Sequence, residues 1–92
     1  MDQLPKYQNL IIPMLRILNN SDSAFNNQEI ELGVADLLNI PETLKSSIHS
    51  GSRTELSYRL GWSRTKAKAS GWVISPKREH WKITDLGKKQ LL

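Results

Sequence analysis

Cysteine is absent from the 92-residue chain, which excludes disulfide bridges, thiol nucleophiles and cysteine-ligated zinc. Long apolar runs are absent as well. None approaches the roughly 20 residues that a membrane-spanning helix needs, and the start, Met1-Asp2-Gln3, lacks the basic region of a signal peptide. We therefore expect a cytoplasmic protein that folds on its apolar core alone. The length predicts a single domain over residues 1–92.

Side chains arranged for catalysis are also scarce. The two histidines, His49 and His80, have no cysteine nearby and no His-x-x-x-His spacing, so the sequence predicts no metal site. No serine stands in a nucleophile elbow, and no glycine-rich phosphate loop is present. We expect no catalytic residue, no cofactor and no enzyme activity in this chain.

Positive charge is concentrated in the second half of the sequence. Residues 1–50 hold three basic and six acidic side chains, a balance of −3, whereas residues 51–92 hold ten basic and three acidic ones, a balance of +7. Such an asymmetry indicates a surface for a polyanion such as nucleic acid. Solubility alone would require a similar net charge but no clustering.

Apolar side chains at helical spacing predict three helices in the first half. The first begins near Pro5 and ends at Asn19, and Pro13 inside it should kink or split it. The second has Asn26 as its N-cap, with Glu29 completing a capping box. A short third helix runs from Pro41 through Ile48.

A longer helix is predicted over residues 53–70. Ser52-Arg53-Thr54-Glu55 reads as its capping box, and Gly71 as the left-handed residue after its end. One side of this helix is apolar or small and predicts contact with the core: Leu56, Leu60, Ser63, Ala67 and Ser70. Another side is basic and predicted to be open: Arg53, Ser57, Gly61, Arg64 and Lys68.

After Gly71 the pattern changes from helical to alternating, which predicts strands over residues 72–75 and 80–83. Residues 76–79 join them, with Pro76 at position i+1 of the turn and two cations at its tip. Thr84 caps a last helix over residues 85–92. The fold class is thus mostly α with a small β-hairpin. This is the order of a winged helix-turn-helix, with three to four helices, a two-stranded wing and a C-terminal helix.

Several short sequence motifs in the second half of the chain resemble those of a known family. They are Arg59-x-x-Trp62, the helix end Ala67-Lys68-Ala69-Ser70-Gly71, Pro76-Lys77-Arg78, and Trp81-Lys82-Ile83-Thr84-x-x-Gly87; the first helix adds Tyr7, Ile12-Pro13 and Leu15. In these the chain resembles the N-terminal domain of Mrr-type restriction endonucleases. Gly61 stands where that family more often has a polar or basic residue. It costs about 1 kcal/mol of helix stability relative to alanine and permits a close approach.

The resemblance implies a winged helix that serves as the DNA-binding part of a nuclease. Helix 53–70 would then lie in the major groove, and the wing at 76–79 would contact a neighbouring groove or the backbone. Arg53 is the candidate for a guanine, whereas Arg64 and Lys68 are expected on phosphates. The predicted DNA-binding residues are Arg53, Thr54, Ser57, Tyr58, Arg59, Arg64, Lys68, Lys77 and Arg78. Arg59 also has a structural interpretation, as a cation paired with a carboxylate of the first half, and the three tryptophans are expected to pack in the fold.

The nuclease of that family holds a metal ion with an acidic residue followed by Asp/Glu-x-Lys. None of the nine carboxylates here has a lysine two positions later, so the cleaving domain is expected downstream in a longer protein. Two alternatives stay open. One is a protein-interaction or dimerisation module that uses Ile11 and Leu15 or Trp62; the other is a free-standing transcription regulator. The bases read, any sensing of methylation and the formation of a homodimer are also open.

Overall fold

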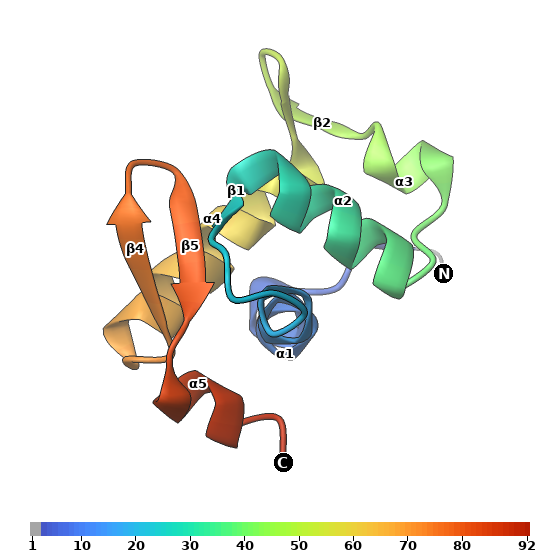
Figure 1. Ribbon diagram of the computed structural model, residues 1–92. Coiled ribbons are helices and arrows are strands. Elements are labelled where there is room, and N and C mark those ends of the chain that lie inside the picture. The colour runs from blue at the N-terminus through green and yellow to red at the C-terminus, as the bar shows by residue number, and fades with distance from the viewer. Residues whose placement is uncertain (1–2) are drawn as a thin grey trace.

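The computed structural model describes residues 3–92, in which helices and short strands surround the first helix (Figure 1). The helices are α1 (Tyr7–Leu18), α2 (Asn27–Leu37), α3 (Glu42–Lys45), α4 (Glu55–Ala69) and α5 (Asp85–Lys89). The strands are β1 (Phe25–Asn26), β2 (Ile48–Ser50), β3 (Arg53–Thr54), β4 (Val73–Lys77) and β5 (His80–Ile83). None of the helices in this part of the chain is long and apolar enough to cross a membrane.

The core lies where α1 packs against α2 and α4. Helix α1 contributes Leu10, Met14, Leu15 and Leu18, and these residues are almost fully buried. Complete burial of such a side chain stabilises the fold by roughly 1.5–3 kcal/mol. The core also contains Ile30, Val34 and Ala35 of α2, Leu56, Leu60 and Ala67 of α4, Val73 of β4 and Ile83 of β5, together with Leu4, Ile11 and Ile40.

Helix α1 begins at Tyr7, two residues after the expected start, and it continues through Pro13 to Leu18. The sequence predicted a kink or a split at this proline, and the split does not occur. Proline removes one hydrogen bond, the one to the Asn9 carbonyl. Because Asn9 is exposed, water can satisfy that carbonyl, and the packing of α1 against α2 and α4 offsets the remaining cost.

The capping box of α2 is confirmed, and the same residues also form a strand that the sequence did not predict. The Glu29 amide donates to Asn26 Oδ1 and the Asn26 amide to Glu29 Oε1, both at 2.8 Å. Phe25 and Asn26 pair with Trp81 and His80 of β5. The sheet therefore has three antiparallel strands in the order β1-β5-β4, so the β4–β5 hairpin, the predicted wing, is joined to the start of α2.

The region before α4 differs from the prediction. The short helix α3 ends at Lys45 rather than at Ile48, which starts β2 and pairs with Thr54 of β3. The chain reverses at Gly51, whose φ of 55° favours glycine. Since residues 53–54 belong to a strand, α4 starts at Glu55, and its N-cap is Thr54 rather than Ser52.

The C-terminal elements follow the predicted order with shifted boundaries. The turn of the β4–β5 hairpin is Arg78-Glu79, and Pro76 lies within β4 rather than in the turn, where the register with β5 is irregular. Proline is tolerated there because it need not donate to the ladder. Thr84 caps α5 by accepting from the Gly87 amide at 3.0 Å, as expected, but the helix ends at Lys89.

Candidate nucleic-acid interface

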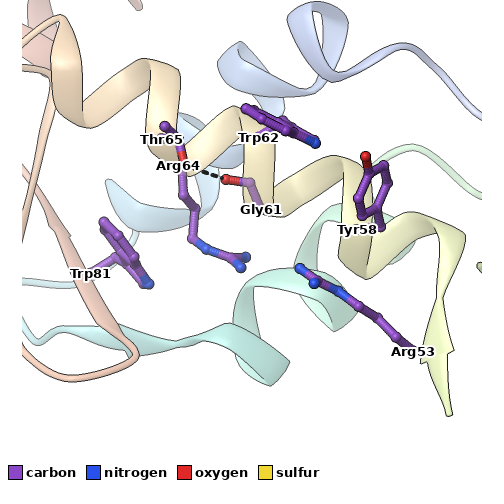
Figure 2. Close-up of a pocket in the computed structure, with 7 residues that line it drawn as sticks. All are labelled: Arg53, Tyr58, Gly61, Trp62, Arg64, Thr65 and Trp81. Carbon is purple, nitrogen blue, oxygen red and sulfur yellow. Dashed lines mark hydrogen bonds between the residues drawn. The ribbon is translucent and has the colours of Figure 1, made fainter. Parts of the chain in front are cut away.

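A hollow of about 340 Å³ opens on α4 where this helix meets β3 and β5. Arginine and aromatic side chains surround it (Figure 2). Its walls are Arg53 of β3, Trp81 of β5, and Tyr58, Gly61, Trp62, Arg64 and Thr65 of α4. It therefore combines residues of the predicted DNA-binding helix with a residue of the predicted wing.

Arg53 reaches this hollow from the strand that precedes α4. The residue is exposed, and its Cζ lies 5.5 Å from the centre of the Tyr58 ring, within the range of a cation–π contact. Its expected place in the first turn of the helix is wrong. Its side chain nevertheless points along the α4 face (Figure 2).

Arg64 is buried, with 7% of its surface exposed, so the prediction of an open position for it is wrong. Its Cζ lies 5.7 Å from the centre of the Trp81 ring. Burial lowers the pKa of Arg64, the charge of Arg53 lowers it further, and the carboxylates of Glu31 and Glu79 act in the opposite direction. The sequence pattern placed Arg64 on an open side of the helix because it could not show that β5 carries Trp81 beside it.

Two of the predicted DNA contacts are engaged inside the fold. The Thr54 hydroxyl accepts from the Ser57 amide and donates to Glu31 Oε2 at 2.9 Å. Arg59 Nη1 donates to the carbonyls of Leu4 and Pro5, at 2.8 and 3.1 Å. Arg59 Nη2 also lies 3.5 Å from Glu55 Oε1. The structural interpretation of Arg59 fits this geometry, although its carboxylate partner is in α4 and not in the first half.

The remaining predicted contacts lie on α4 and on the wing. Ser57 and Tyr58 are half-buried in the first turns of α4, and Lys68 is exposed in its last turn. Lys77 ends β4 and Arg78 lies in the turn, both exposed. Within residues 3–92, neither Lys68 nor the two wing cations form an ion pair.

An aromatic row that the sequence did not predict borders the hollow. The rings of His49 and Tyr58 stack at 3.7 Å, and Trp62 lies 6.5 Å from both Tyr58 and Tyr7. Trp62 is 51% exposed, so its expected packing role holds only for one side of the ring. Trp72 and Trp81 are partly buried against the core, close to the expected arrangement. The spacing of Tyr58 and Trp62, four residues apart in a helix, was the available signal for this row.

In the described part of the chain, no group of three His, Asp or Glu side chains could hold a metal ion. The absence of a metal site and of catalysis stays a prediction of the sequence.

Comparison with known proteins gives one result that covers nearly the whole chain. No curated protein matches the sequence, and no solved structure matches the fold. The profile of the Mrr N-terminal domain family, however, matches residues 7–92. These residues include the α4 face, the hollow and the wing, and the match confirms the resemblance seen in the sequence. The chain belongs to the Mrr N-terminal domain family.

Proposed function

We propose that this chain is a winged-helix module that binds duplex DNA, with α4 in the major groove and the β4–β5 wing on the adjacent backbone. One observation carries the proposal. Residues of β3, α4 and β5 border one hollow, in which Arg53 and Arg64 lie beside Trp81 of the β4–β5 hairpin, so two cations share one surface with that hairpin. Family membership is consistent with a domain associated with a restriction system.

The order of the elements supports the winged-helix part of this proposal. A strand and α2 precede α4, and the β4–β5 hairpin follows it in a sheet ordered β1-β5-β4. An α-helix fits the roughly 12 Å width of the major groove. Arg53 of β3, which the sequence predicted on a guanine, shares the hollow with Arg64. These two arginines and the exposed Lys68, Lys77 and Arg78 are the candidates for phosphates. We assign no chemical reaction to the chain.

The test is the salt dependence of binding to a short duplex, measured by fluorescence anisotropy. With four or five phosphates neutralised, the logarithm of the association constant should fall against that of the salt concentration with a slope of about −4. The variants Lys68→Gln and Arg78→Gln should each reduce the slope by about 1. Arg16→Gln, an exposed cation on α1, is the matched control and should leave it unchanged. A flat salt response in the unmodified chain would contradict the proposal.

The exposure of Trp62 favours a second candidate, a protein-interaction module. Ile11 and Leu15 are buried and are therefore wrong as contact residues, but Trp62 borders a second hollow of about 570 Å³ beside Tyr7 and Leu4. Sedimentation with and without DNA distinguishes the two functions. Self-association that is abolished by Trp62→Ala, with no DNA complex, would favour the second. Site selection from random duplexes would separate a transcription regulator, which requires a discrete operator, from a restriction module.

A further inference from the structure

We infer that the hollow between Arg53 and Arg64 binds one phosphate group of the DNA backbone, which the two guanidinium groups hold together. The inference rests on the DNA-binding function proposed above and assigns a ligand group to one place in that interface. It gives a role to Arg64, a buried cation, and to Gly61, the departure from the family pattern.

The two guanidinium groups converge on one point. Arg53 Nη2 lies 2.9 Å, and Arg64 Nη2 3.6 Å, from the position that a Cβ on Gly61 would occupy. Figure 2 shows the two groups pointing toward each other from opposite sides of the hollow. A single small ligand above Gly61 is therefore within reach of both.

Neither guanidinium group has an anionic partner in residues 3–92. The ion pairs there involve Arg59, Lys45 and His49, and no hydrogen bond joins the Arg53 or Arg64 side chain to another described residue. Glu31 and Glu79 are near enough to act on Arg64, but neither carboxylate reaches it. Two neighbouring positive charges, one of them largely removed from water, are unfavourable until an anion compensates them.

The aromatic contacts determine which part of each arginine is available. Tyr58 lies against Arg53, and Trp81 against Arg64. A cation–π contact occupies a face of the planar group and leaves the N–H donors at its edge. Those edges meet over Gly61, where the several oxygens of a tetrahedral phosphate can accept from both arginines.

The charge of the site favours a phosphate over a base. The edge of a guanine is neutral and offers its two acceptors to one arginine, so it would compensate the charge of neither. A phosphodiester carries a negative charge, and its oxygens can accept from both arginines, neither of which has an anionic partner in the described residues. The hollow also lies between α4 and the wing strand β5, beside the groove where the proposed complex places the DNA backbone.

The direct test uses the nitrogen-15-labelled chain, monitored by the Nε–Hε signals of its five arginines. Dimethyl phosphate is the probe, because it carries the single charge of a backbone phosphodiester; acetate tests for a carboxylate ligand. We expect saturable shifts at Arg53 and Arg64, with Arg16 unmoved as the internal control. Equal shifts at all arginines, or a stronger response to acetate, would overturn the inference.

Two variants separate this role from a structural one. Gly61→Ala places a methyl group 2.9 Å from Arg53 Nη2, at the flexible end of a side chain, while it removes a helix-weakening glycine. We expect its melting temperature to stay the same or rise, whereas its affinity for dimethyl phosphate falls about tenfold. Arg64→Lys keeps the charge but loses the forked geometry and should show the same loss of affinity. Unchanged affinity in both variants would overturn the inference.

A duplex scanned with single methylphosphonates, which neutralise one phosphate at a time, identifies the source of the ligand. At one phosphate position in each bound site, the methylphosphonate should lower the affinity of the unmodified chain for the duplex about tenfold. The affinity of the Arg64→Lys variant should hardly change at the same position. If the methylphosphonate and Arg64→Lys instead lower the duplex affinity additively at every position, the inference is overturned, but the proposed DNA-binding function is not. If the unmodified chain binds no duplex, the proposed function fails, and the dimethyl phosphate titration alone decides whether the site binds phosphate.

Discussion

The Thr54 hydroxyl joins α4 to α2, because it accepts from the Ser57 amide at 3.0 Å and donates to Glu31 Oε2 at 2.9 Å. One side chain thus caps α4 and fixes its start against a neighbouring helix. Replacing Thr54 by valine keeps the shape and removes both bonds. We expect the free energy of unfolding in urea to fall by about 2 kcal/mol.

The matched control for that change is Thr65→Val. Thr65 is exposed, and its hydroxyl donates to the Gly61 carbonyl one turn earlier in α4, so no other element depends on it. Its free energy of unfolding should change by no more than about 0.5 kcal/mol. Equal losses in the two variants would contradict the assigned role of Thr54.

Arg59 should behave as a structural residue in spite of its place on α4, the helix that we propose binds DNA. The Arg59→Gln variant loses the donors to the Leu4 and Pro5 carbonyls, and we expect a loss of about 1–2 kcal/mol in unfolding free energy. The slope of DNA affinity against salt should stay that of the unmodified chain, since the cation neutralises no phosphate. A slope reduced by about 1 would instead place Arg59 on the DNA.

Gly87 allows α5 to pack directly against the backbone of Trp72. A Cβ at this position would lie 2.2 Å from the Trp72 carbonyl oxygen and 2.8 Å from Ile83 Cγ1. Because one of these neighbours is backbone, Gly87→Ala should cost about 2–3 kcal/mol, or roughly 10–20 °C in melting temperature. Gly51→Ala is the comparison: nothing lies within 4 Å of its Cβ position, and only its positive φ is penalised, by about 1 kcal/mol. The reverse order of the two losses would show that close approach is not the cause.

The two tryptophans at the hollow should differ in their effect on stability. Trp81 Nε1 donates to Asn27 Oδ1 at 2.7 Å, and its ring lies against Arg64. We expect Trp81→Phe to lower the unfolding free energy by about 2 kcal/mol. Trp62→Phe, at a half-exposed position, should cost less than about 1 kcal/mol. Chemical denaturation followed by circular dichroism measures both changes.

The sequence predicted the parts of this fold that depend on local chemistry. The reciprocal bonds of Asn26 and Glu29, the Thr84 cap and the left-handed Gly71 are each set by residues close together in the chain. The apolar side of α4 was also predictable, because a period of 3.6 fixes which residues share a face.

The features that depend on distant pairing were missed. Ser52 and Thr54 are both good N-caps in sequence, and the pairing of β3 with β2 decides in favour of Thr54. The helical pattern of α4 likewise contains no information about β5, so the burial of Arg64 under Trp81 could not be predicted. The candidate hollow is made of such contacts, and the sequence identified its cations but not their arrangement.

The pairing of β1 with β5 has a consequence for how a duplex could be accommodated. Phe25 and Asn26 pair with β5 directly before the first turn of α2, which connects the β4–β5 hairpin to the helices. Such preorganisation lowers the entropic penalty of complex formation. It also transfers the adjustment to the nucleic acid, whose groove width must match a fixed separation. Flexible pyrimidine–purine steps should therefore be preferred even where no side chain touches a base.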